Sequence, residues 1–485
     1  MKRIAIIGAG FRGIGCLRVL LQHGYQVDVY EKNNDVGGVW HPSNNYQGLK
    51  IHTPAKLNQF FDFPYPDNID LSERLGSKQI FEYIKSFCIA KDLYSHITFN
   101  TQVHKIQYNT QSKTSTLLLS TNNGREYVTN KYDFIINTNG FCDKHIPEFK
   151  GAEKFNGEII HSFDATEEEI KSIISSNKKV TVVGAGKTST DLVSTFSKYN
   201  YKLTWLYRKA YWFLRFSPLQ NAIKNGSSGD SGFSIYKMLM LLGFLISSHF
   251  PNLGCWLWKM TDVIDTYGER HSDFKKFHVA LIDDSEFKTL KESNKLYGVI
   301  GEIDRFDKNG YYLKNKRFIE SDVVICCTGS SGTKSLVNIE IDGEKLNLNN
   351  VYKSYRASVI PQVPNLIFTA YHHFVMGLGD GELQAQWIMN YMESNYNEAY
   401  LRKNALTYDY PFFTKLILFD ASEYYFPSFM KMQFDFIKNH EMGSMEYVKF
   451  IYNFFFKPGR LEPLKMNFST HVQEHEIRTA PIEHA

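Results

Sequence analysis

The chain opens on a short apolar run, a cluster of glycines, and then apolar positions spaced as on one face of a helix. Ile4 to Ile7 predict a buried strand, and the helix that follows has its apolar residues between Cys16 and Leu21. A second apolar run, Val27 to Tyr30, predicts the next strand. Strand, glycine turn, helix and strand in this order are typical of a dinucleotide-binding fold.

The same order of elements recurs further along the chain. Val180 to Val183 predict a strand, and Leu192, Val193 and Phe196 predict the buried side of a helix. Another strand is predicted over Leu203 to Tyr207. Two copies of one pattern predict an α/β fold with two Rossmann-like dinucleotide-binding domains.

The two glycine turns differ in detail. The first, Gly8 to Gly13, is a full GxGxxG, whereas Ser189 replaces the third glycine of the second and predicts a turn slightly further from its strand. Gly186-Lys187-Thr188 also ends the phosphate-binding motif of nucleotide hydrolases. That motif needs a glycine where Thr181 stands, so the hydrolase hypothesis is excluded.

The residue that ends the second strand changes charge between the copies. Glu31 lies about 20 residues after Gly8, where a carboxylate accepts hydrogen bonds from ribose hydroxyls. Arg208, followed by Lys209, holds the matching place after Gly184. A guanidinium binds a 2′-phosphate that a carboxylate would repel. We therefore expect FAD or NAD at the first site and NADP at the second.

Composition and residue spacing exclude several classes of protein. The 485 residues are 43% hydrophobic, enough for two or three domains, and the net charge of +4 argues neither for nor against an anionic partner. The six cysteines show no CxxC spacing, which argues against a disulfide framework, a metal site or a redox dithiol. No secretory signal opens the chain, and the longest apolar run, Met238 to Ile246, is about half of the roughly 20 residues that span a bilayer. We expect a cytoplasmic protein with no transmembrane segment and no nucleic-acid partner.

Six further segments give a family resemblance. They are GGVW (Gly37–Trp40), FFDFPYP (Phe60–Pro66), FNGEIIHSFD (Phe155–Asp164), RKAYW (Arg208–Trp212), DVVICCTG (Asp322–Gly329) and ELQAQW (Glu382–Trp387). In this order they resemble segments of the flavin-containing monooxygenases and their relatives, the class B flavoprotein monooxygenases that include Baeyer–Villiger enzymes. The resemblance covers about residues 1 to 215 and 280 to 390.

The resemblance implies a division of the chain. An FAD-binding domain is expected in two parts, 1–150 and 329–400, and an NADPH-binding domain in two parts, 151–215 and 281–328. A helical, apolar insertion over 216–280 is expected to form the substrate pocket, or else to touch a membrane surface. An irregular C-terminal extension fills 401–485.

The resemblance also implies the activity. With FAD and NADPH, a C4a-(hydro)peroxyflavin would insert one oxygen atom from O2 into a small organic substrate, most simply at nitrogen or sulfur. A Baeyer–Villiger or other specialised oxidation is the alternative, although no arginine lies between Gly140 and Gly184 to stabilise a peroxyflavin. Thioredoxin-reductase-like electron transfer lacks its paired cysteines. A non-catalytic flavoprotein is the third hypothesis, and the oligomeric state stays open.

The resemblance and the two glycine turns together predict which residues contact the cofactors. Those for FAD are Gly8, Gly10, Phe11, Arg12, Gly13, Glu31, Lys32, Gly38, Val39, Trp40, Thr53, Val103 and Gln384. Those for NADP are Gly184, Gly186, Lys187, Thr188, Ser189, Arg208 and Lys209.

His52 is the expected catalytic residue. The resemblance places a polar side chain there, usually asparagine or aspartate, and an imidazole would hydrogen-bond to the oxygenated flavin; a structural histidine is the alternative. His161 is expected to hold the connection between the domains, where Ala165 replaces an aromatic residue of the family fingerprint. Tyr371 to His373 are candidates for the pocket lining.

Overall fold

A computed structural model of the chain describes residues 2–51, 54–140, 144–208, 212–215, 264–265, 279–282, 290, 292–329, 337–346, 353–355, 358–369, 377–393, 398–404 and 406–407. The expected insertion over 216–280 and the expected extension from 401 onward lie almost wholly outside these residues. So do His52, Thr53, Lys209 and Tyr371 to His373.

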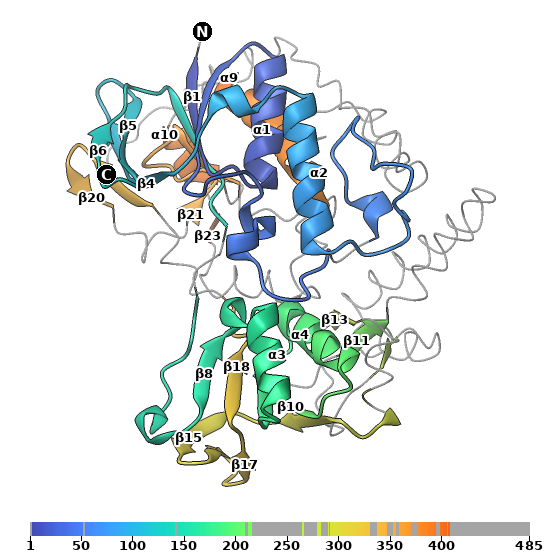
Figure 1. The fold of residues 1–485 in the computed structure, drawn as a ribbon. Coiled ribbons are helices and arrows are strands. Elements are labelled where there is room, and N and C mark those ends of the chain that lie inside the picture. The colour runs from blue at the N-terminus through green and yellow to red at the C-terminus, as the bar shows by residue number, and fades with distance from the viewer. Residues whose placement is uncertain are drawn as a thin grey trace.

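The first sheet has five strands in the order β22-β7-β1-β2-β3, and all neighbours are parallel (Figure 1). Their bounds are β1 Arg3–Ile7, β2 Gln26–Tyr30, β3 Ile97–Thr98, β7 Phe134–Asn137 and β22 Leu366–Phe368. Ile4 and Ile6 of β1 pack into one buried cluster, and Ala5 and Ile7 into another. Since both faces are covered, the strand needs an uninterrupted apolar run, which is what the sequence shows.

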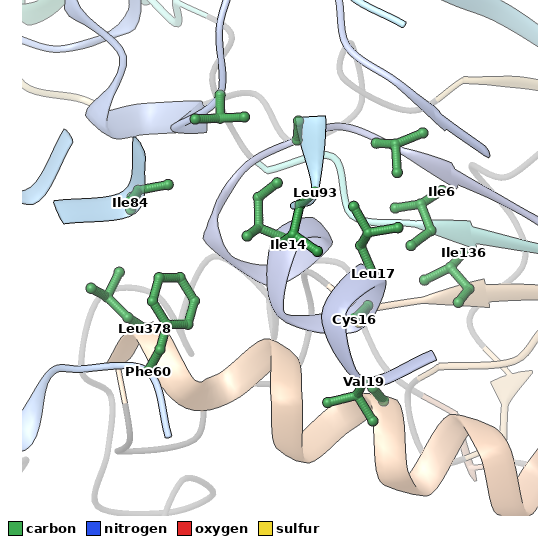
Figure 2. Close-up of a cluster of buried hydrophobic side chains, with 14 of the residues drawn as sticks. Ile6, Ile14, Cys16, Leu17, Val19, Phe60, Ile84, Leu93, Ile136 and Leu378 are labelled. Atoms are coloured by element: carbon green, nitrogen blue, oxygen red, sulfur yellow. The ribbon is translucent and has the colours of Figure 1, made fainter. Parts of the chain in front are cut away.

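Helices cover one face of this sheet and a second sheet covers the other. The helices are α1 Phe11–Gln22, α2 Ser77–Ala90 and α9 Asp380–Glu393, with α10 Glu398–Asn404 following. The second sheet has the order β20-β19-β4-β5-β6, with β4 Thr101–Asn109, β5 Thr114–Thr121, β6 Glu126–Val128, β19 Asn338–Ile341 and β20 Glu344–Lys345. Figure 2 shows part of the core on the helical side, where Leu17 of α1 lies near Ile6 of β1 and Ile136 of β7, and Ile84 of α2 belongs to the same cluster.

The other half of the molecule repeats this plan. Its parallel sheet has the order β14-β10-β9-β18-β8, with β8 Glu158–His161, β9 Val180–Val183, β10 Leu203–Tyr207, β14 Leu296–Ile300 and β18 Val323–Cys326. One face carries α3 Glu167–Ser175 and α4 Lys187–Lys198. The other carries the sheet of β15 Ile303–Asp307, β16 Gly310–Leu313 and β17 Phe318–Glu320. The predicted fold with two Rossmann-like halves is confirmed.

Two small sheets complete the described strands. One contains β11 Trp212–Arg215, β12 Ile264–Asp265 and β13 Val279–Ile282, and the other pairs β21 Lys353–Ser354 with β23 Leu406–Thr407. Among the helices described here, none is both long and apolar enough to cross a membrane.

A close contact between α1 and α9 joins the two ends of the first half. A Cβ on Gly15 would lie 2.8 Å from the Glu382 nitrogen, and one on Gly381 would lie 2.4 Å from the Arg12 carbonyl oxygen. Larger side chains at these two glycines would therefore separate the helices. The sequence pattern does not predict this contact.

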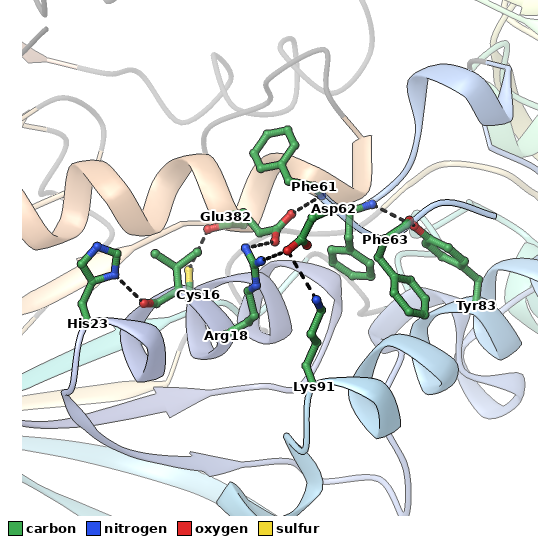
Figure 3. Close-up of polar contacts among 12 residues, drawn as sticks. Cys16, Arg18, His23, Phe61, Asp62, Phe63, Tyr83, Lys91 and Glu382 are labelled. Atoms are coloured by element: carbon green, nitrogen blue, oxygen red, sulfur yellow. Dashed lines mark hydrogen bonds and ion pairs between the residues drawn. The ribbon is translucent and has the colours of Figure 1, made fainter. Parts of the chain in front are cut away.

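A buried ion pair lies beside that contact (Figure 3). Arg18 Nη1 donates to Glu382 Oε1 at 2.9 Å, and the Phe61 amide donates to Glu382 Oε2 at 2.7 Å. Arg18 Nη2 also reaches Asp62 Oδ2 at 2.5 Å. The pair thus ties the FFDFPYP segment to both helices.

Replacing Arg18 with methionine should lower the free energy of unfolding by about 3–5 kcal/mol where Glu382 is ionised, because its carboxylate would then lose the buried cation that pairs with it. Burial raises the pKa of Glu382 to about 8 in the native protein, against the opposing effects of the Phe61 amide and Arg18. Because the pKa of Glu382 is higher in the native protein than in the unfolded chain, this group stabilises the folded state at low pH. That stabilisation is lost as the pH rises through about 8. The loss in Arg18→Met should therefore be larger at pH 8 than at pH 5.5, measured by urea denaturation.

Lys91→Met is the matched control. Lys91 Nζ lies 3.4 Å from Asp62 Oδ2, and both side chains are partly exposed. Removing such a surface charge should cost less than about 1 kcal/mol. Equal losses in the two variants would contradict the role given to the buried pair.

Candidate functional site

The first glycine turn follows β1 and holds α1 directly against it. Gly8 has φ +97°, a left-handed conformation that favours glycine. A Cβ on Gly13 would lie 2.1 Å from the Gly8 carbonyl oxygen. These two glycines are therefore required by the turn itself.

The GGVW segment packs on this turn. The Gly37 amide donates to the Ala9 carbonyl at 3.0 Å, and a Cβ on Gly38 would lie 2.9 Å from the Gly10 Cα. The short helix η1 (Gly38–Trp40) follows, with Trp40 buried and Val39 half-buried. The Trp40 Nε1–H is buried and has no acceptor within the described part of the chain.

Glu31 closes the other side of the turn. Its side chain is 4% exposed; Oε2 accepts from the Ala9 amide at 2.7 Å, and Oε1 accepts from the Asn33 amide at 2.9 Å. An ionised carboxylate has about four acceptor positions, so both oxygens can still accept hydrogen bonds from ribose hydroxyls. The ribose contact stays a prediction, and the bond to the Ala9 amide is one that the sequence pattern does not predict.

Gly10 shows that this turn fits a dinucleotide. Its backbone is extended, with φ −71° and ψ 174°, and a Cβ there would meet only Gly38, at an ordinary 3.5 Å. No contact in the described protein therefore requires glycine at this position. Gly10 is also the N-cap of α1 without a side-chain cap, so the helix offers its first N–H groups to an anion. A diphosphate that approaches the backbone closely accounts for both features.

The other predicted FAD residues surround this turn to different degrees. Phe11 and Arg12 begin α1, and Arg12 is buried. Lys32 is exposed next to Glu31, and Val103 lies on β4, whose Thr101 amide donates to the Glu31 carbonyl at 2.9 Å. Gln384 is buried on α9, the helix that packs on α1.

The second glycine turn follows β9 in the same way. Gly184 has φ +118°, and a Cβ there would lie 2.6 Å from the Cys327 carbonyl oxygen. Trp205 Nε1 donates to the Gly184 carbonyl at 2.7 Å. Ser189 is fully buried, and its hydroxyl donates to the Gly186 carbonyl at 2.6 Å. Ser189 thus adds a hydrogen bond where the first turn has a glycine, and the greater separation of this turn from its strand stays a prediction.

Arg208 lies at the edge of the β14-β10-β9-β18-β8 sheet from which the second glycine turn begins. It follows β10, the parallel neighbour of β9, and the Gly184 amide donates to the Leu206 carbonyl at 2.8 Å. Arg208 is exposed, whereas Glu31 at the matching place of the first half is buried. The structure therefore places opposite charges at corresponding ends of β2 and β10.

A polar cluster joins the two halves at α4, and two of its members, Tyr46 and Asp191, are not among the residues predicted from the sequence. The Tyr46 hydroxyl donates to Asp191 Oδ2 at 2.9 Å, and Lys187 Nζ bonds to the same oxygen. Burial lowers the pKa of Lys187 to about 8, although the Asp191 carboxylate raises it. An acidic residue next to Leu192 and Val193 on a predicted buried helix face was the available signal for Asp191.

The connections between the halves run past His161. Its Nδ1 accepts from the Phe163 amide at 3.3 Å, so Nε2 carries the proton and donates to the Gly329 carbonyl at 3.2 Å. Burial lowers the pKa of His161, which keeps the ring neutral. Ala165 is fully buried, and its carbonyl accepts from the Gln47 amide at 3.3 Å. The expected role of His161 at the domain connection agrees with these bonds.

Comparisons with known proteins agree with this geometry. Residues 1–222 match the sequence model of the family described as flavin-binding monooxygenase-like. The chain is 25% identical to a probable flavin-containing monooxygenase 1 of Arabidopsis thaliana over 81% of its own length and 83% of the relative. It is 27% identical to senecionine N-oxygenase of Tyria jacobaeae, but this match covers 42% of the chain and 46% of the relative.

A solved structure shows the shared fold. The open form of cyclohexanone monooxygenase matches with a TM-score of 0.57 at 19% identity, over 80% of this chain and 87% of that one. Together with the two turns, these matches show that the chain is similar to the flavin-containing monooxygenases and has the fold of a flavin monooxygenase with two dinucleotide-binding halves, in agreement with FAD and NADPH as cofactors.

Proposed function

We propose that the chain uses NADPH and O2 to oxygenate a small organic substrate at a nitrogen or sulfur atom. The observation that carries the proposal is the pair of matched folds with Glu31 and Arg208 at corresponding strand ends, since it provides two nucleotide sites of opposite charge. The likeness to an N-oxygenase supports nitrogen as one target. A flavin-mediated reaction between the two nucleotides follows from this arrangement.

The residues of the first half bind and orient FAD in this proposal. The N–H groups at the start of α1 bind the diphosphate beside Gly10, and Glu31 accepts the ribose hydroxyls. The buried Trp40 Nε1–H supplies a further donor. When bound, FAD supplies electron transfer from NADPH and the activation of O2.

The residues of the second half bind NADPH. Gly184 to Ser189 surround the diphosphate, and Arg208 binds the 2′-phosphate from the adjacent strand end. Lys209, outside the described residues, is proposed to assist Arg208. The proposed FAD-binding parts are 1–150 and 329–400, and the proposed NADPH-binding parts are 151–215 and 281–328.

His52 is proposed to hydrogen-bond to the reacting groups at the flavin, and it lies outside the described residues. The fold shared with cyclohexanone monooxygenase makes Baeyer–Villiger oxidation of a ketone the second candidate. The four described cysteines, Cys16, Cys88, Cys326 and Cys327, are free thiols, in keeping with the cytoplasmic location that we propose.

The deciding experiment has two stages. NADPH added without oxygen should bleach the bound flavin of the purified protein, and oxygen should then be supplied with a panel of amines, sulfides and ketones. Mass detection of one added oxygen atom identifies the substrate class. A flavin that NADPH does not reduce would contradict the proposal, and products from ketones alone would favour the Baeyer–Villiger candidate.

Gly10→Ala should raise the Kd for FAD about tenfold, which corresponds to roughly 1.4 kcal/mol of binding energy, and should therefore lower the FAD content of the purified protein. The added methyl group would occupy the space that the diphosphate needs. The measurement is flavin absorbance per mole of protein.

Gly76→Ala is the control for this change. Gly76 is the N-cap of α2 with φ −79° and ψ 167°, and a Cβ there would meet its neighbours only at 3.9 Å. Both substitutions carry the same small N-cap cost, but only Gly10 adjoins the first turn. Normal flavin content in Gly10→Ala would argue against the FAD assignment.

Arg208→Ala should raise the KM for NADPH by a factor that corresponds to about 1.5–3 kcal/mol, because a charged hydrogen bond to the 2′-phosphate is lost. The KM for NADH should change little. Lys202→Ala removes an exposed charge from the opposite end of β10 and should affect neither coenzyme. Steady-state oxidation of NADPH and of NADH gives the KM values of the native protein and of both variants. An equal rise in KM for both coenzymes in Arg208→Ala would contradict the proposed contact with the 2′-phosphate.

A further inference from the structure

We propose that Tyr46, which belongs to the FAD-binding half, is a positioning residue for the NADPH site: acting through Asp191, it sets how readily Lys187 binds the coenzyme diphosphate. The inference rests on the proposed binding of NADPH at the second turn. It gives that site a residue from the other half of the molecule.

Tyr46 contacts the second glycine motif directly. It is 4% exposed, its hydroxyl donates to Asp191 Oδ2 at 2.9 Å, and the Thr188 side chain also hydrogen-bonds to it. Thr188 and Lys187 are neighbours in the turn, and Asp191 lies one helical turn further along α4. One tyrosine thus contacts both the turn and the helix that follows it.

The backbone around Tyr46 holds the hydroxyl in place. Gly48 has φ +87°, and a Cβ there would lie 2.1 Å from Thr195 Oγ1 on α4. The Tyr46 ring stacks on Phe163, with 6.0 Å between ring centres. Because the segment after GGVW lies this close to α4, the hydroxyl cannot move away from Asp191 without moving one half against the other.

Asp191 is shared between two donors. Tyr46 and Lys187 both donate to Oδ2 of Asp191. The hydrogen bond from Tyr46 therefore weakens the attraction between this carboxylate and the Lys187 ammonium. Lys187 has three N–H donors at the start of α4, where an anion is favoured. Sharing Asp191 therefore leaves Lys187 positioned but available to the diphosphate.

The charges that face Lys187 make coenzyme binding depend on pH. Burial lowers the pKa of Lys187 to about 8; Asp191 raises it, and Arg74 and Lys50 lower it. Burial also raises the pKa of Tyr46 and of nearby Cys327, so both stay neutral in this range. The ammonium attracts a diphosphate below this pKa and loses its charge above it. NADP⁺ binding should therefore weaken as the pH rises through about 8.

The test measures NADP⁺ binding to the FAD-loaded protein by calorimetry between pH 6.5 and 9.5. In Tyr46→Phe, Asp191 should hold Lys187 more strongly: the Kd at pH 7 should rise about threefold to tenfold, and the midpoint should move to higher pH. In Asp191→Asn the ammonium loses its anion, so the midpoint should move to lower pH. Lys187→Gln should remove this pH dependence.

Tyr201→Phe is the matched control. Tyr201 donates to the Lys178 carbonyl at 2.6 Å before β10 begins, at the end of the sheet opposite the glycine turn, and its loss should leave NADP⁺ binding unchanged. Unchanged affinity and midpoint in Tyr46→Phe would overturn the inference, and so would shifts of Tyr46→Phe and Asp191→Asn in the same direction. If Asp191→Asn fails to fold, Tyr46→Phe and Lys187→Gln decide the matter. A native protein that binds no NADP⁺ would instead overturn the proposed function.

Discussion

The contact between α1 and α9 is the constraint on which the first half of the molecule depends. The first helix of the chain packs on a helix that returns after the whole second half, and their glycines let the backbones approach closely. The Arg18–Glu382 pair lies beside this approach in a setting where an unpaired charge would be costly. The Phe61 amide donates to the same Glu382 carboxylate, so the contact between the helices also positions the segment between GGVW and α2.

The two halves use one scaffold for opposite electrostatic purposes. Each has a five-stranded parallel sheet with helices on one face and a second sheet on the other. In the first, Glu31 is buried and bonded to the turn; in the second, Arg208 is exposed at the matching strand end. The Glu31 carboxylate can be buried because nearby N–H groups donate hydrogen bonds to it.

The interface between the halves is polar where it adjoins the second turn. Tyr46, Lys187 and Asp191 are all buried or nearly so, and they satisfy one another across the boundary. His161 contributes a separate polar link to the returning strand end at Gly329. Small residues allow this proximity, because Ala165 and Gly48 leave room for backbone contacts between the halves.

The sequence by itself determined the two nucleotide-binding units and their different charges. Each depends on a strand, a turn, a helix and a strand end that follow one another within about 30 residues, so local spacing fixes which residues meet. Only the tertiary structure decided that Arg18 pairs with Glu382, that Tyr46 contacts Asp191, and that Glu31 holds the turn through the Ala9 amide. The first two contacts join residues far apart along the chain, and the third depends on how β2 lies beside the turn. Such contacts are set by the packing of whole elements against one another, which no local pattern of side chains encodes.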